Sequence, residues 1–155
     1  MMVLLVVITG LMAGTYFAFS IFIMKSLAEL PPLEAAKAMN KINDVIVTTL
    51  FLPIFFCSTI WFSGLFIWSV INWQNEQSMM LSIAAVIYVV GMLGVTVFGN
   101  VPLNNQLKVG ALDDSSLVEI WQFYVLRWTR FNHIRMISCI ASCALLTMAQ
   151  AVSGR

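Results

Sequence analysis

The chain has 155 residues, of which 61% are hydrophobic and 10% are charged, and its mean hydropathy is +0.93. Soluble domains average about 45–50% apolar and about 25% charged residues, so this composition excludes a free globular enzyme. The many apolar residues also exclude a disordered chain, and the net charge of +1 excludes the basic face that nucleic-acid binding needs. The class that remains is an integral membrane protein.

Four apolar runs predict four membrane-spanning helices. The runs are continuous rather than alternating and are long enough to cross about 30 Å of hydrocarbon, which favours helices over strands. We expect spans at about residues 2–24, 45–71, 79–101 and 134–152 within a single transmembrane domain, 1–155. The first run lacks a basic residue before Lys25 and is too long for a signal peptide, so we expect it to be retained. The predicted fold class is therefore all-α, an integral membrane four-helix bundle.

The connections predict how the bundle is oriented. Seven of the eight lysines and arginines fall on one side of this topology, and Arg155 is the one on the other side. Because positively charged connections stay in the cytoplasm, we expect loops 24–44 and 102–133 inside and both termini outside, in the cell inner membrane. Each cytoplasmic connection has the pattern of an amphipathic helix, over residues 33–43 and again from Ser116, where Glu119 completes a capping-box pattern.

Polar residues within apolar runs are costly in lipid and are therefore informative. In the first span a polar face forms beside Gly10 and Gly14, a GxxxG pattern that permits close helix approach, with simple packing as the alternative. At the start of the second span, Asp44 shares a face with other polar residues, and it either pairs with a cation or is only a favourable charge at a helix start. The members of the two polar faces are Thr9, Ala13, Tyr16 and Ser20, and Asn40, Asn43, Asp44 and Thr48.

Two prolines predict irregular helices. Pro53 is expected to kink the second span. Pro102 disfavours the helical conformation of Val101, so the third span either breaks there and frees backbone carbonyls or simply stops at the interface. Asn100 and Asn104 flank this point at helical spacing, four residues apart.

The fourth span predicts the richest polar stripe. If one helix runs from Ser116 through this span, five residues recur every three or four positions and share one face: Trp121, Tyr124, Trp128, Asn132 and Arg135. His133 stands beside this face. Arg135 lies at the hydrocarbon edge and needs an anion, and we expect that anion to be Asp44 on the same side of the membrane.

Several kinds of chemistry have no basis in this sequence. It has one histidine, so a His-rich metal site cannot form within one chain, and we predict no metal and no cofactor. A haem with His133 as its axial ligand is the alternative. Cys139 and Cys143 lie four residues apart on one predicted helix, which is too far for a disulfide, and no Walker loop or GxGxxG is present.

The segment from Asn100 to Asn104 (Asn-Val-Pro-Leu-Asn) and the segment from Trp121 to Arg135 carry a family resemblance. Together they resemble a family of small four-span membrane proteins that includes the anthrone oxygenases. The likeness covers most of the chain, and the positions that match the motif are Asn100, Pro102, Asn104, Trp128 and Arg135. The resemblance implies a four-span fold and, in some members, O₂-dependent oxidation of an anthrone to an anthraquinone.

Two functions follow as hypotheses. In a cofactor-independent oxygenase, Asp44 would act as general base, and Arg135, Asn100 and Asn104 would hold the developing oxyanion. The substrate, a lipophilic aromatic molecule, would be bound by Tyr16, Trp121, Tyr124, Trp128, Asn132 and His133. In a non-catalytic accessory subunit or lipid-binding module, the same polar groups would only lock the bundle. The expected partners are membrane lipids, a lipophilic aromatic small molecule, and a second copy or another membrane protein; nucleic acid is not expected.

Overall fold

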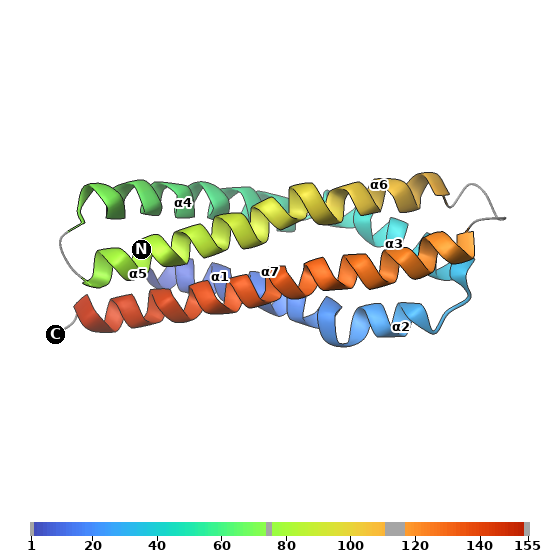
Figure 1. Ribbon diagram of the computed structural model, residues 1–155, viewed down its shortest axis with the longest axis horizontal. Coiled ribbons are helices and arrows are strands. Elements are labelled where there is room, and N and C mark those ends of the chain that lie inside the picture. Colours follow the sequence, from blue (N-terminus) through green and yellow to red (C-terminus); the bar gives the residue numbers. More distant parts are fainter. Residues whose placement is uncertain (1, 74–75, 111–116, 154–155) are drawn as a thin grey trace.

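The computed structural model describes residues 2–73, 76–110 and 117–153, and every element in these ranges is a helix. The elements, in chain order, are α1 (Met2–Ala18), the π-helical η1 (Phe19–Ile23), α2 (Met24–Ala28), α3 (Pro32–Ile46), α4 (Phe51–Ile71), α5 (Glu76–Tyr88), the π-helical η2 (Val89–Gly94) and η3 (Thr96–Asn100), α6 (Val101–Gly110) and α7 (Leu117–Ser153). They form four rods that lie side by side, with successive rods running in opposite directions (Figure 1): α1–η1–α2, α3 followed by α4, α5 through α6, and α7. Each rod contains a helix long and apolar enough to cross a membrane, which confirms the predicted all-α membrane bundle.

The rods are longer than the hydrocarbon layer is thick. Helix α7 has 37 residues, which corresponds to about 55 Å at 1.5 Å per residue, against about 30 Å of hydrocarbon. The fourth helix thus begins well before residue 134, and α2, α3, α6 and the start of α7 extend past the apolar part at one end of the bundle (Figure 1). We call it the charged end because it holds Lys25, Glu29, Glu34, Lys37, Lys41, Asp44, Lys108, Glu119, Arg127 and Arg130.

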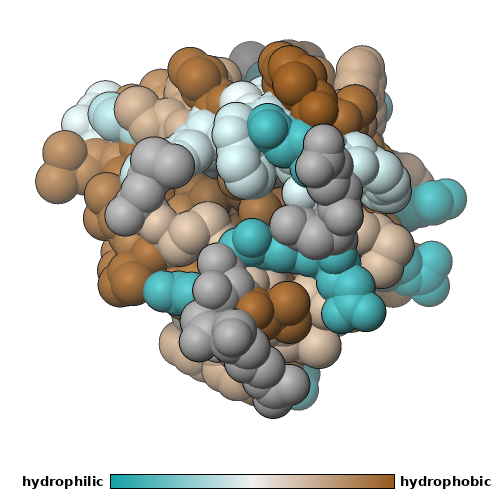
Figure 2. All heavy atoms as spheres, turned by 90° about the vertical axis from the view of Figure 1, so that its left-hand side faces the viewer, coloured by the Kyte–Doolittle hydropathy of each residue, from teal (hydrophilic) through white to brown (hydrophobic). Residues whose placement is uncertain are grey.

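The opposite end holds the C-terminus and the α4–α5 turn. Figure 2 looks onto this end and shows hydrophilic side chains on the end face, with hydrophobic side chains around them. Arg155 and Ser116, which entered the orientation and capping predictions, lie outside the described residues.

The second rod is broken rather than kinked. The hydroxyls of Thr48 and Thr49 each donate to one of the last carbonyls of α3 at 2.8 Å, and Thr49 Oγ1 accepts from the backbone N–H of Phe51 at 3.3 Å. These bonds end α3 and begin α4, so the prediction of one helix over residues 45–71 is wrong. Pro53 lies in the first turn of α4, where its missing N–H is not needed. The predicted kink at Pro53 is therefore replaced by a break before it.

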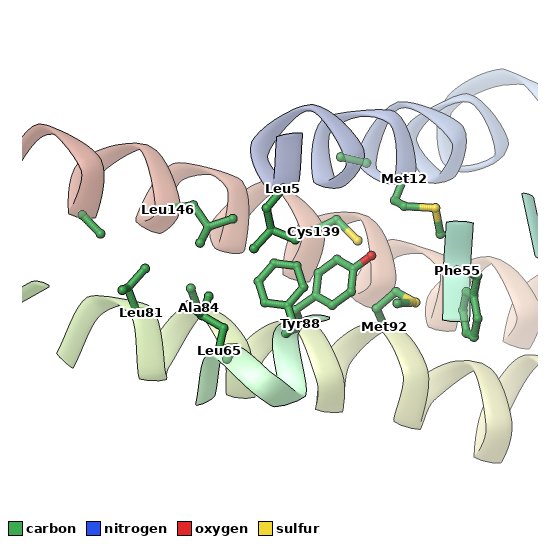
Figure 3. Close-up of a cluster of buried hydrophobic side chains, with 14 of the residues drawn as sticks. Leu5, Met12, Phe55, Leu65, Leu81, Ala84, Tyr88, Met92, Cys139 and Leu146 are labelled. Atoms are coloured by element: carbon green, nitrogen blue, oxygen red, sulfur yellow. The ribbon is translucent and has the colours of Figure 1, made fainter. Parts of the chain in front are cut away.

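Apolar packing and a few hydroxyl bonds hold the membrane part together. Phe62 and Tyr88 stack with their ring centroids 4.0 Å apart, and Figure 3 shows Tyr88 at the centre of this core. The hydroxyl of Tyr88 donates to Ser58 Oγ at 2.8 Å, and Ser142 Oγ donates to the carbonyl of Ala84 at 2.9 Å. In lipid, packing and such interhelical hydrogen bonds take the place of the hydrophobic effect between helices.

Glycines mark where α7 touches the third rod. A Cβ added at Gly91 would overlap Ser138 Oγ and lie 2.5 Å from Ser138 Cβ, and one added at Gly99 would meet the ring of Phe131 at 2.9 Å. By contrast, a Cβ at Gly10 or Gly14 would have no neighbour within 4 Å. The GxxxG pattern therefore faces outward and makes no close approach to another described helix of this chain.

Candidate functional site

A cavity of about 160 Å³ lies between the rods, at the level where the second rod breaks. All four rods contribute to it, and we call it the arginine cavity. Its lining consists of Thr15, Tyr16, Phe19, Asn43, Ile46, Val47, Phe51, Leu52, Phe55, Thr96, Asn100, Val101, Asn104, Trp128, Asn132 and Arg135. The polar residues of this set come from the charged side of the apolar runs, so the cavity lies near one surface of the membrane.

Two of the π-helical segments border the arginine cavity. η1 contributes Phe19, and η3 contributes Thr96 and Asn100. Short π-helical segments are rare and are frequently found at functional sites. Just before η1, the carbonyl of Tyr16 accepts a hydrogen bond from Asn132 Nδ2 at 2.7 Å, and the same amide donates to Ser20 Oγ at 2.7 Å. The irregular register thus lets a side chain of α7 tie into the backbone of the first rod.

Pro102 does not break the third rod. Val101 has ordinary helical dihedral angles, φ −63° and ψ −46°, and α6 continues through the proline to Gly110. The proline lies where the π pattern of η3 gives way to the α pattern of α6, which is a point of irregular hydrogen bonding in any case. The third rod therefore neither breaks nor stops at Pro102, and both alternatives for this position are wrong.

Arg135 is buried in the arginine cavity without a carboxylate partner among the described residues. Its side chain is 6% exposed; Nη2 donates to Asn132 Oδ1 at 2.7 Å and Nη1 to Thr96 Oγ1 at 3.4 Å. The guanidinium carbon lies 4.5 Å from the centre of the Tyr16 ring and 5.1 Å from that of Trp128, both within cation–π range. Neutral groups and aromatic rings alone thus surround a buried cation, an arrangement that is favourable for an anionic ligand.

Asp44 lies elsewhere. It accepts a hydrogen bond from Lys108 Nζ at 3.0 Å, and both side chains are more than half exposed. Asp44 is not part of the cavity lining. The predicted pair between Asp44 and Arg135 is therefore wrong, because α3 ends before the membrane-spanning α4 and keeps its carboxylate in water.

Asn104 organises the aromatic side of the cavity. Its Oδ1 accepts from Tyr124 OH at 2.8 Å and from Trp128 Nε1 at 2.9 Å, while Nδ2 donates to Asn43 Oδ1 at 3.2 Å. Trp121, Tyr124 and Trp128 stack in sequence, with centroid distances of 5.6 and 6.2 Å. Since Trp128 alone of these three rings lines the cavity, Asn104 and the other two rings hold it in place.

Four buried polar atoms of the cavity residues have no hydrogen-bond partner: Tyr16 OH, Asn43 Nδ2, Asn100 Oδ1 and Arg135 Nε. In the described part of the chain, one other buried side-chain atom is in this state, Thr129 Oγ1. Buried polar groups in proteins are nearly always paired, so a concentration of unpaired ones calls for a specific explanation. Three of the four can donate and one can only accept, a set that a ligand with several oxygens would satisfy.

Comparison with known families agrees with this architecture. Residues 45–145 match the model of the anthrone oxygenase family. The match covers well over half of the chain. The chain belongs to the anthrone oxygenase family. A search of curated proteins and a search of solved structures found no match.

The cavity of this anthrone oxygenase family member brings together six of the ten residues predicted for the site. These are Tyr16, Asn100, Asn104, Trp128, Asn132 and Arg135. The other four lie outside its lining: Asp44 is on the surface, Trp121 and Tyr124 pack behind Trp128, and His133 lines a neighbouring cavity. Among the described residues, no three His, Cys, Asp or Glu side chains come together as a metal site would require.

Sequence analysis missed several apolar residues of the cavity, above all Phe51 and Phe55. Their spacing of four residues places them on one face of α4, but apolar periodicity within an apolar span is a weak signal. Asn43 was visible as a member of a polar stripe, and Thr96 precedes Asn100 by the same four-residue spacing that separates Asn100 from Asn104. The structure shows that Asn43 and Thr96 both face the other polar residues of the family member's cavity.

Replacing Asn104 with leucine should destabilise the family member. The change removes the shared acceptor of Tyr124 and Trp128 and leaves a buried hydroxyl and an indole N–H unpaired, at about 1–3 kcal/mol for each. We expect a lower midpoint of thermal unfolding in detergent for Asn104→Leu. The exposed neighbour Asn105 is the matched control, and equal midpoints for Asn104→Leu and Asn105→Leu would contradict the assigned role.

Proposed function

We propose that the arginine cavity oxidises an anthrone-like lipophilic aromatic molecule with O₂, without a cofactor. The observation that supports this most is the buried Arg135, which has no carboxylate partner in the described chain and retains an unpaired Nε. Membership of the anthrone oxygenase family supplies the reaction class.

The chemistry requires an anion. An anthrone loses a proton from its central CH₂ group to give an enolate, whose negative charge rests largely on oxygen. The enolate transfers electrons to O₂ and a C–O bond forms at the central carbon, giving a hydroperoxide. Loss of the remaining C–H proton and cleavage of the O–O bond then give the second carbonyl and water. The balance is anthrone plus O₂ to anthraquinone plus water, so no further oxidant is required.

The residues of the cavity suit the steps of this reaction. Arg135 stabilises the enolate oxygen, and the unpaired N–H groups of Arg135 and Asn43 donate to it, as in an oxyanion hole. Tyr16 OH is available to donate to the peroxide oxygen, and Asn100 Oδ1 to accept from a phenolic hydroxyl of the substrate. We propose that the substrate enters as the neutral anthrone and releases its proton to water once it lies beside Arg135, because the cavity lining contains no carboxylate.

The rim of the cavity favours a substrate that arrives through the lipid. Val47 and Val101 both line the cavity and are 52% and 42% exposed, so they border an opening on the side of the bundle. Trp128, Phe51 and Phe55 supply apolar and aromatic surface inside. A planar, greasy molecule dissolved in the bilayer is the kind of ligand that such an opening admits.

This account predicts a small effect for Asp44→Asn. The carboxylate is exposed and paired with Lys108, and exposed ion pairs contribute about 0–1 kcal/mol. Turnover should remain within about twofold of the original protein and the thermal midpoint should hardly change. A loss of turnover with an unchanged midpoint would instead assign Asp44 the role of general base.

The direct test is turnover in lipid nanodiscs. Purified protein should convert anthrone to anthraquinone faster than empty nanodiscs do, with one O₂ consumed per product. With ¹⁸O₂, one labelled oxygen should appear in the quinone. A rate equal to that of empty nanodiscs, or of heat-denatured protein, would contradict the proposal.

A further inference from the structure

A second cavity, of about 400 Å³, lies between α2 and α7, next to the arginine cavity. Ser20, which accepts the hydrogen bond from Asn132, forms part of its wall. Lys25 comes from α2, and Thr129, Arg130 and His133 come from α7. None of the four belongs to the lining of the arginine cavity, so neither the reaction nor its proposed mechanism uses them.

The second cavity carries positive charge that the described residues do not neutralise. Lys25 and Arg130 are exposed and His133 is half-buried. Of the described residues, only Lys108 and Asp44 come within 4.0 Å as an ion pair, so these three make none. Glu29 caps the C-terminus of α2, four residues after Lys25, yet it forms no such pair with it. The wall therefore presents basic groups from two different rods to one space.

Thr129 adds a polar group without a hydrogen-bond partner to the residues that line this space. A threonine hydroxyl inside a helix usually donates to the carbonyl four residues earlier, and Thr9, Thr15, Thr59, Thr96 and Thr147 all do so here. Thr129 Oγ1 is buried and makes no such bond. Outside the arginine cavity, Thr129 Oγ1 is the one buried side-chain atom of the described chain that has no hydrogen-bond partner, and Thr129 lines the second cavity.

The position of this cavity selects the ligand. It lies where the rods pass from their apolar part to the charged end, which is the level of the lipid headgroups. Ile137, one turn beyond His133 on the same face of α7 and toward the membrane, is 59% exposed and offers apolar surface for an acyl chain. A phosphate held by basic groups with a greasy tail below it is the chemistry of a phospholipid, and anionic lipids are attracted by juxtamembrane lysines and arginines.

We propose that the cavity formed by Lys25, Thr129, Arg130 and His133 binds the phosphate headgroup of an anionic phospholipid. The hydroxyl of Thr129 donates to a phosphate oxygen, and Lys25 and Arg130 provide the positive charge. This site is independent of the oxidation proposed for the arginine cavity, and its failure would leave that proposal untouched.

The test compares lipid binding by native mass spectrometry of the purified full chain. Phosphatidylglycerol should bind more tightly than phosphatidylcholine, and the Lys25→Gln/Arg130→Gln double variant should weaken phosphatidylglycerol binding by roughly tenfold or more. Arg127→Gln is the matched control, because Arg127 lies on the same helix over the ring of Phe123 and outside the cavity. It should bind phosphatidylglycerol like the original protein.

Thr129→Val distinguishes specific binding in this cavity from general electrostatic attraction of anionic lipid, since it removes a hydroxyl and changes no charge. It should weaken phosphatidylglycerol binding severalfold while circular dichroism and the elution profile stay the same. Equal binding of the two lipids, or equal weakening by Arg127→Gln, would overturn the proposal. Binding of inorganic phosphate at millimolar concentration, as tight as that of phosphatidylglycerol, would also overturn the proposal in favour of a soluble anion.

Discussion

Arg135→Met should abolish most of the turnover without unfolding the protein. Arg135 is the cation in the arginine cavity, and losing one donor of an oxyanion site typically lowers kcat by about 10²–10³-fold. The same change removes a buried charge that has no carboxylate partner in the described chain, and methionine fills a similar volume. Methionine also leaves Asn132 Oδ1 without its donor, which costs about 1–3 kcal/mol and offsets part of this gain. We therefore expect a thermal midpoint close to that of the original protein, together with the loss of activity.

Two further variants make this result specific. Arg135→Lys keeps the charge but loses the planar fork that reaches both Asn132 and Thr96, so it should retain partial activity. Arg127→Met, an exposed position on the same helix, should leave turnover unchanged. Full turnover by Arg135→Met would remove the arginine from the mechanism, and a large fall in its thermal midpoint would make the residue structural instead.

Among the glycines that the structure describes, Gly91→Ala should be the most destabilising substitution by alanine. The new Cβ would lie 2.5 Å from Ser138 Cβ, an atom that cannot move unless α7 moves away from the third rod. Overpacking of this kind costs about 1–3 kcal/mol. We expect a clear fall in the thermal midpoint, measured by intrinsic fluorescence in detergent.

The chain provides both a control and a rescue for this experiment. Gly10→Ala adds the same methyl group where no atom lies within 4 Å, so its midpoint should be unchanged or slightly higher, as helix propensity favours alanine. Ser138→Gly removes the clashing side chain, and the double variant Gly91→Ala/Ser138→Gly should recover part of the loss. If the two glycine variants behaved alike, the close approach at Gly91 would be refuted.

Sequence reasoning was most successful along single helices. The spacing of Trp128, Asn132 and Arg135 predicts one face of one helix, and the structure shows all three buried on α7 and lining the same cavity. This follows from helical geometry alone, since a period of 3.6 residues fixes which side chains share a face.

Contacts between helices were harder to predict. Asp44 and Arg135 lie on the same side of the predicted topology, but that placement does not reveal the break after α3, where the carboxylate pairs with Lys108 in water. The break depends on two local hydroxyl bonds, from Thr48 and Thr49, within an otherwise apolar run.

The aromatic residues show a related limit. Tyr124 and Trp121 have the right spacing to stack on a substrate, yet they stack on each other, and Tyr124 stacks on Trp128. Periodicity gives their face and not their partner. The π-helical segments beside the cavity are likewise invisible in the sequence, because no residue preference distinguishes η1 or η3 from an ordinary helix.

The most direct measurement is the ionisation of a hydroxyanthraquinone dye bound to the protein in neutral-lipid nanodiscs. Its absorption shifts to longer wavelength when the phenol becomes an anion, and a cation a few ångströms away favours the anion. With the original protein, the midpoint pH of this shift should be lower by about one unit or more than in empty nanodiscs, and Arg135→Met should return it to the empty-nanodisc value. The same midpoint with the original protein, with Arg135→Met and with empty nanodiscs would contradict an anion-stabilising arginine at the heart of this bundle.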